Sequence, residues 1–230
     1  MNSVGEAFGY PFRDSGWVGK IAVQGLITII PIVGWIATAG WLMLTFDNLK
    51  AGRQELAPAG FHLARGIGIF AVSIIYSIVL NIPMYILNGM GAASVQVNQA
   101  NGFNSYYGSP FRALGSLWGL LASLFLDFLL PSLIVLVARN GFGGGFDIGR
   151  VWAMATGNMS NSIIGGLVIF IAGIIAALGL VACCIGVFFT IVYAAAINAG
   201  VAAWFDRMQA APAAPPSFGP PSPVSGSGSA

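Results

Sequence analysis

Residues 162–178 have the sequence SIIGGLVIFIAGIIAAL, which carries no charged side chain. In a membrane barrel, polar and apolar side chains would alternate along each strand, and this stretch shows no such alternation. A chain segment in lipid must satisfy its own backbone hydrogen bonds, either as a helix or in a closed barrel. The stretch therefore predicts an α-helix embedded in a membrane.

The uncharged region around this stretch extends from residue 151 to residue 205. The hydrocarbon core of a bilayer is about 30 Å thick, and a helix needs roughly 20 apolar residues to cross it. The region is therefore long enough for two helices, which we place at 162–178 and 185–205. Two more apolar segments are predicted nearer the N-terminus, at 67–87 with a kink near Pro83 and at 114–137.

The composition of the whole chain points to the same class of protein. Only 7% of the 230 residues are charged, against about 25% in ordinary soluble proteins. So few charges could not cover the surface of a soluble fold of this size. The composition therefore excludes a soluble enzyme, a nucleic-acid-binding protein and a disordered chain. The net charge of +2 is too small to attract partners over long distances.

The first apolar run, 21–46, is interrupted by Pro31. Proline lacks an amide donor and disfavours helical geometry in the residue before it. Two interpretations are open: one kinked span, or a hairpin of two short helices near 15–30 and 35–49, tilted or re-entrant. A cleaved signal peptide is disfavoured, because its leader would exceed the usual 15–30 residues.

The distribution of basic residues favours the hairpin, because cytoplasmic loops are enriched in Lys and Arg. With the hairpin, Arg112 alone lies on one side of the membrane, and the other eight basic residues share the opposite side: Arg13, Lys20, Lys50, Arg53, Arg65, Arg139, Arg150 and Arg207. We therefore expect an all-α, polytopic membrane bundle of about six hydrophobic helical segments. Its expected location is the inner (plasma) membrane, with both termini cytoplasmic and the polar connector 92–109 outside.

Two short sequence echoes suggest a loose three-plus-three internal duplication. Pro11-Phe12-Arg13 recurs as Pro110-Phe111-Arg112, and residues 60–65 recur loosely as 145–150. Coincidence in a chain rich in Gly and Phe is the other interpretation. We divide the chain into a membrane-embedded domain, 1–208, and a tail, 209–230, which is rich in Pro, Ala, Ser and Gly and is expected to be disordered.

Residues 8–20, FGYPFRDSGWVGK, contain the pattern F-x-D-x-x-W-x-x-K. An apolar run, the dipeptide Ile30-Pro31 and a second apolar segment follow. In these features the chain resembles the uncharacterised prokaryotic membrane family of domain of unknown function 4013, over about residues 5–208. Residues 57–61 depart from the pattern, since they lack its acidic and Trp residues. The resemblance implies a multi-pass membrane protein and supplies no established activity or catalytic residues.

Asp127 is the one ionisable residue deep within a predicted span. A charge at that depth costs about 2.5–3.5 kcal/mol on insertion scales, so such residues face the bundle interior, water or a partner. Asp127 is either part of a proton- or cation-linked site or a buried carboxyl that locks helices together. Uncharged candidates for the same intramembrane polar site are Asn81, Asn198 and Tyr193.

The sequence contains a single histidine, His62, and no phosphate-binding loop, metal-ligand motif or catalytic triad. We therefore expect no catalytic residues, no cofactor and no metal, and a protein that is not an enzyme. The first expectation for its function is a structural or accessory subunit, or a scaffold, in the membrane. The alternative is a small-molecule or ion transporter that uses Asp127 and broken helices. The expected partners are the lipid bilayer and other membrane subunits or a second copy, but no nucleic acid.

Overall fold

The computed structural model describes residues 3–100, 110–182 and 185–210. At residues 93–100 and 182 it describes the backbone but not the side chains. In the described residues the chain is helical, with no strand. The elements are α1 (Glu6–Gly9), the 3-10 helix η1 (Tyr10–Arg13), α2 (Trp17–Thr28), α3 (Val33–Lys50), α4 (Leu63–Ala100), α5 (Pro110–Asn140), the 3-10 helix η2 (Phe142–Phe146), α6 (Ile148–Gly157), α7 (Met159–Ala182) and α8 (Gly186–Ala210).

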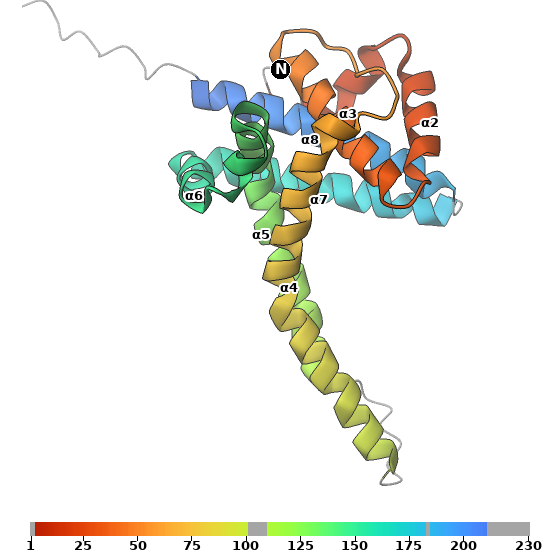
Figure 1. Cartoon of the computed structure of the whole chain (residues 1–230), viewed down its shortest axis with the longest axis vertical. Helices are drawn as coiled ribbons and strands as arrows, with labels where there is room; N and C mark the ends of the chain where they lie inside the picture. The colour runs from red at the N-terminus through yellow and green to blue at the C-terminus, as the bar shows by residue number, and fades with distance from the viewer. Residues whose placement is uncertain (1–2, 101–109, 183–184, 211–230) are drawn as a thin grey trace, which may run out of the picture.

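The helices form a body from which one long hairpin projects (Figure 1). Helices α4 and α5 make the hairpin, and α7 and α8 run across its direction in this view. Helix α8 packs against α1, α2, α3, α5 and α7, so the last of the described helices lies at the centre of the body. Helix α8 contributes several small side chains to the core, among them Ala196, Ala199 and Ala203.

Four of the described helices are long and apolar enough to cross a membrane: Leu63–Ala92 of α4, Pro110–Asn140, Met159–Val181 and Gly186–Ala210. The chain is therefore a multi-pass, all-α membrane protein. The expected count of about six segments is not confirmed. Helices α2 and α3 occupy the other two predicted positions, but α2 has 12 residues and spans only about 18 Å.

Residues 21–46 form the hairpin rather than one kinked span, because Gln24 and Thr28 of α2 hydrogen-bond to Thr38 of α3 across the turn. Ile32 has φ 63° and ψ −61°, and the Val33 N–H donates to Pro31 O at 2.7 Å. This is the geometry of a γ-turn, which is strained for a branched residue. Behind the turn, a Cβ on Gly34 would lie 2.1 Å from Ile27 O. Glycine at this position therefore allows the two helices to meet.

The polar connector predicted at 92–109 is partly wrong. Helix α4 continues through Pro83 to Ala100, since residues 92–100 contain no further proline or glycine and polar side chains do not by themselves end a helix. Residues 101–109 lie outside the described residues. At the other end of the chain, α8 extends to Ala210, two residues into the predicted tail, and residues 211–230 also lie outside the described part.

The internal duplication is not confirmed. Pro11-Phe12-Arg13 lies in the short 3-10 helix η1, whereas Pro110-Phe111-Arg112 opens the 31-residue helix α5. Residues 60–65 lead into α4, which has 38 residues, and residues 145–150 lead into α6, which has 10. Equivalent motifs therefore begin elements of different kind and length.

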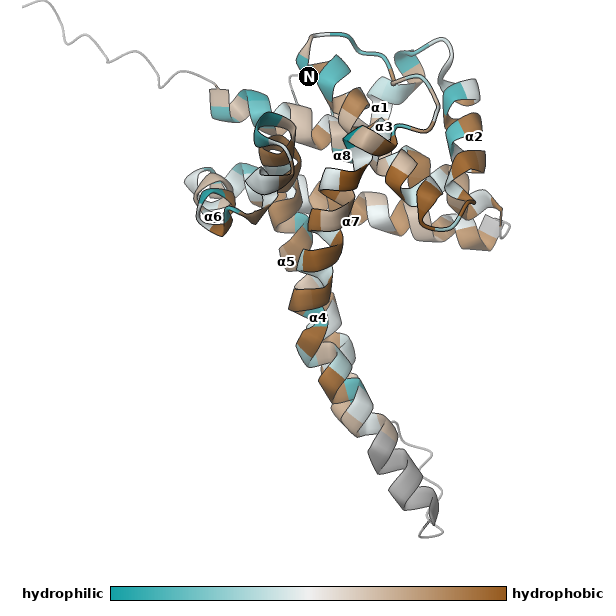
Figure 2. Ribbon diagram, in the orientation of Figure 1, coloured by the Kyte–Doolittle hydropathy of each residue, from teal (hydrophilic) through white to brown (hydrophobic). Residues whose placement is uncertain are grey.

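Basic residues gather at the end of the body that holds the 51–62 connector, where Figure 2 shows most of the hydrophilic colour. Asp206 of α8 forms ion pairs with Arg139 of α5 and, at 3.4 Å, with Lys50 of α3. Arg65 pairs with Asp47 at 2.7 Å. Three helix ends are thus tied together by charge. Arg112 lies in the first turn of α5, at the end of that helix opposite Arg139.

The side chains of the sequence pattern at residues 12–20 form a compact cluster of contacts at the start of α2. The Asp14 carboxylate accepts hydrogen bonds from Lys20 Nζ (2.7 Å), Gly16 N (2.8 Å) and Leu56 N (2.9 Å). The Phe12 and Trp17 rings meet edge to face, with centroids 4.9 Å apart. The four residues of the pattern therefore act in pairs that fix the N-terminal segment against the 51–62 connector.

Candidate site around Asp127

Asp127 lies in α5, twelve residues before Arg139, a distance of about 18 Å along the helix. The only other acidic residue in the four candidate spans is Asp206, which is held by its two ion pairs. Within the described part of the chain, the Asp127 carboxylate makes no hydrogen bond or ion pair. It is therefore the one intramembrane carboxylate without a protein partner there.

Glycines of α7 determine what faces Asp127. A Cβ on Gly166 would lie 2.9 Å from Phe128 Cα and 3.2 Å from the carbonyl carbon of Asp127. A Cβ on Gly165 would lie 3.4 Å from Pro131 Cγ. Small residues allow helix backbones to approach closely in a membrane. The Gly165-Gly166 pair therefore brings α7 into direct contact with the backbone of α5 at Asp127.

A cavity of about 390 Å³ lies beside this contact, between α5, α7 and α8. Its lining consists of Ser123, Asp127, Leu130, Ile169, Phe170, Gly173, Ile174, Ala177, Ala194 and Asn198. Asn198 Oδ1 is buried and has no hydrogen-bond partner among the described residues. Buried polar atoms are nearly always paired in folded proteins. The cavity thus combines the Asp127 carboxylate, the Asn198 amide oxygen and the Ser123 hydroxyl with apolar neighbours.

The structure brings together two of the four predicted polar residues, Asp127 and Asn198, and separates the other two from them. Asn81 Nδ2 donates to Ser77 O at 2.8 Å within α4. Tyr193 donates its hydroxyl to Phe8 O at 2.8 Å, and its ring centroid lies 5.5 Å from that of Phe12. Asn81 therefore belongs to the projecting hairpin, and Tyr193 fastens α8 to the N-terminal segment.

The donor and acceptor chemistry of the cavity suits a cation or a proton donor. An ionised carboxylate and an amide oxygen only accept hydrogen bonds, and a hydroxyl such as that of Ser123 can also accept. Among the described residues, no three His, Cys, Asp or Glu side chains cluster in a way that could hold a metal ion. The arrangement fits a monovalent cation, a protonated amine or a proton better than a tightly coordinated transition metal.

Two features of the molecule were not predicted from the sequence. One is the Asp206 cluster, although Asp206 and Arg207 adjoin the end of an apolar run and such ends often carry pairing charges. The other is an apolar cavity between α4, α5, η2 and α6. No signal in the sequence indicates this second cavity, because it depends on how four separate elements meet.

The model of a protein family of unknown function (DUF4013) matches residues 23–185 of this chain. The pattern F-x-D-x-x-W-x-x-K at residues 12–20 lies before the matched segment. No curated protein and no solved structure matches the chain. The match covers most of the chain, including helices α3 to α7 and therefore Asp127 in α5. The chain therefore belongs to the family of proteins of unknown function DUF4013.

Proposed function

We propose that this membrane protein is a small-molecule or ion transporter whose Asp127 cavity takes up a proton or a small cation. The observation that carries the proposal is the pairing, in one cavity of about 390 Å³, of an unpartnered Asp127 carboxylate with the unsatisfied Asn198 Oδ1. Ionisable residues within membrane spans commonly mark ion or proton pathways. The proposal contains no catalytic step and needs no cofactor.

The energetics support a binding role for Asp127. An unpaired charge near the middle of a span costs about 2.5–3.5 kcal/mol on insertion scales. A bound proton or cation removes that cost, so the occupied cavity is the stable state of the site. The neighbouring Asn198 Oδ1 supplies a second acceptor for a cation or for a proton-bearing group. A carrier would also expose this site to the two sides of the membrane in turn.

The transporter proposal can be tested in liposomes that contain the full chain and a pH-sensitive dye. A potassium diffusion potential is imposed, and proton entry is measured with and without external sodium. We expect Asp127→Asn to lower the flux at least fivefold while the protein still elutes as a single folded species. Asp147→Asn, which changes a carboxyl outside the spans, should keep the wild-type flux. Absence of flux from the wild type, or equal flux from Asp127→Asn, contradicts the proposal.

A second candidate function is a structural or accessory subunit that holds other membrane proteins. A different observation favours it: the α4–α5 hairpin projects from the body (Figure 1), and only 11% of the most apolar window of α4 is buried within the protein. In this case a stoichiometric partner should copurify from native membranes in mild detergent. Ile82→Ser, on the exposed hairpin surface, should release that partner, whereas Asp127→Asn should not.

We also propose that the end rich in basic residues faces the cytoplasm of a cell whose inner membrane the protein crosses. Lys50, Arg65 and Arg139 meet at this end through their ion pairs, and Arg112 lies at the opposite end of α5. Cytoplasmic segments near span ends carry an excess of Lys and Arg. This orientation would place both chain termini in the cytoplasm, as the charge distribution predicts.

A further inference from the structure

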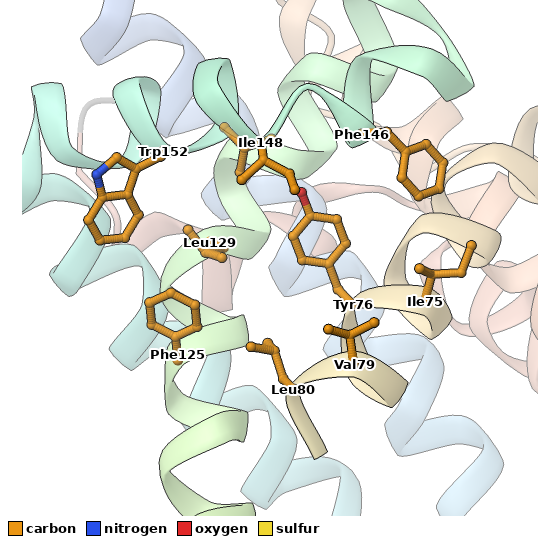
Figure 3. Close-up of a pocket in the computed structure, with 10 residues that line it drawn as sticks. Ile75, Tyr76, Val79, Leu80, Phe125, Leu129, Phe146, Ile148 and Trp152 are labelled. Carbon is orange, nitrogen blue, oxygen red and sulfur yellow. The ribbon is translucent and has the colours of Figure 1, made fainter. Parts of the chain in front are cut away.

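A second cavity, distinct from the one at Asp127, opens where α6 and η2 meet the projecting hairpin. It has a volume of about 310 Å³. Figure 3 shows side chains from both arms of the hairpin converging on those from η2 and α6. The lining consists of Ile75, Tyr76, Val79, Leu80, Phe125, Leu129, Phe146, Ile148, Val151 and Trp152.

The wall of this cavity is wholly apolar. The one hydroxyl nearby, on Tyr76, donates to Gly145 O at 3.0 Å, so the tyrosine presents its ring to the cavity. On the other side, the Phe125 and Trp152 rings lie with centroids 6.2 Å apart. A ligand here can gain only from hydrophobic and dispersion contacts. Polar or charged solutes are therefore excluded as occupants.

An apolar space of this size is unfavourable when empty and unfavourable for water. A water molecule needs two to four polar partners, which this wall does not offer, and lining atoms without neighbours lose dispersion contacts. Ligand pockets commonly begin near 300 Å³. The cavity therefore has the volume and the chemistry to bind a flexible hydrocarbon chain, which gains about 0.8 kcal/mol for each buried methylene.

The surroundings of the cavity identify the source of that chain. Its wall continues into exposed apolar residues of α4 such as Val79 (57% exposed) and Ile82 (47% exposed), which belong to a candidate membrane span. Some lining side chains are themselves partly exposed, among them Trp152 at 50%, so the cavity opens onto the surface of the protein. A hydrocarbon chain of the surrounding lipid can therefore enter it.

We propose that this cavity is a binding site for one acyl chain of a membrane phospholipid. The site is independent of the Asp127 cavity, because the two share no lining residue. It differs from the general lipid contact of a membrane helix, since four elements line the cavity. A lipid held in this way should survive purification and exchange slowly.

Native mass spectrometry of the full chain, purified in mild detergent, tests the proposal. After removal of native lipid, dioleoylphosphatidylglycerol is titrated into the protein. We expect one tightly bound lipid per chain. Val79→Trp, which fills the cavity, should weaken this binding at least tenfold. Ile82→Trp, one helical turn further along the same exposed surface of α4 and outside the cavity lining, should bind as the wild type does.

Oleic acid, titrated in the same way, distinguishes a membrane phospholipid from a free fatty acid as the source of the chain. We expect oleic acid to bind more weakly than the phospholipid. The proposal is overturned if no lipid is retained, if Val79→Trp and Ile82→Trp weaken binding equally, or if oleic acid binds more tightly than the phospholipid. Thermal unfolding of each variant in detergent separates loss of the site from loss of the fold.

Discussion

Asp14 shows how a single carboxylate can organise several segments of a chain with few charges. Burial tends to raise the pKa of this carboxyl, but hydrogen bonds from Lys20, Gly16 and Leu56 outweigh burial and hold its pKa below the usual value. Lys20 Nζ also donates to Leu56 O at 2.9 Å. The N-terminal segment, α2 and the 51–62 connector therefore depend on one ionised group.

The first prediction concerns Asp14→Asn. The folded pKa of Asp14 is lowered, so its stabilising effect is present above the unfolded pKa of about 3.9 and disappears as the pH falls through the folded value. We expect Asp14→Asn to lower the free energy of unfolding by about 1–3 kcal/mol at pH 7. Between pH 5 and pH 3 the difference from wild type should shrink. Thermal unfolding in detergent across this range measures it.

Asp147→Asn is the matched control for this prediction. Asp147 caps α6 by accepting from Arg150 N at 3.0 Å, and asparagine caps helices about as well as aspartate. Its partner Arg150 is exposed, so their ion pair contributes little. The control should unfold within about 0.5 kcal/mol of wild type. An Asp14→Asn variant with wild-type stability and wild-type acid dependence would show that the hydrogen bonds of Asp14 do not stabilise the fold.

At the scale of the helix, the contact between α5 and α7 determines the geometry of the Asp127 cavity. Gly166 allows the α7 backbone to lie against Phe128 and Asp127, where an added Cβ would meet backbone atoms at 2.9–3.2 Å. Backbone atoms cannot move aside as a flexible side chain can. Gly173, two turns later in α7, has no atom within 4 Å of an added Cβ.

The second prediction compares these two glycines. Gly166→Ala should lower the stability of the protein by about 1–3 kcal/mol, because the added methyl group separates packed helices. Gly173→Ala should leave stability unchanged or raise it by up to about 1 kcal/mol, since alanine favours the helix. The midpoint of thermal unfolding in detergent gives both values. Equal destabilisation by the two substitutions would argue against a close α5–α7 contact.

The positions of helices were more predictable than the faces that they present. Uncharged runs located α4, α5, α7 and α8, and Pro31 indicated the break between α2 and α3. A helix that is apolar all round gives no periodic signal of its buried side. This is why Asn81 and Asn198 seemed equivalent in the sequence, although only Asn198 lines the Asp127 cavity. The close approach at Gly166 was equally hidden, since the region contains many glycines.

At the scale of the whole molecule, the distribution of basic residues could be predicted from the sequence, but the arrangement of the helices could not. The sequence separated Arg112 from the other basic residues, and the contacts of Lys50, Arg65 and Arg139 do gather at one end of the body. The orientation of α7 and α8 across the projecting hairpin (Figure 1) could not be predicted. It depends on side-chain packing between elements that are far apart in the chain, which the order of apolar runs does not encode.

The last prediction concerns orientation in the membrane. In a background in which Cys183 and Cys184 are replaced by alanine, single cysteines are introduced as Ala51→Cys and Ser105→Cys. A membrane-impermeant maleimide added to intact cells should label Ser105→Cys, because the connector between α4 and α5 is predicted to lie outside. Ala51→Cys should react only after the cells are permeabilised. The reverse pattern would invert the proposed topology.

The central position of α8 also sets an order of assembly during synthesis. Leu49 O accepts a hydrogen bond from Arg207, 158 residues later, and Tyr10 donates its hydroxyl to Ala196 O at 2.7 Å. Chains grow at about 5–20 residues per second, so the N-terminal helices wait roughly 8–30 s for the helix that covers them. During that interval α1 to α3 expose the surface that α8 later buries. A ribosome that stalls before residue 196 therefore leaves a chain that cannot close, which makes the early hairpin the part most exposed to quality control.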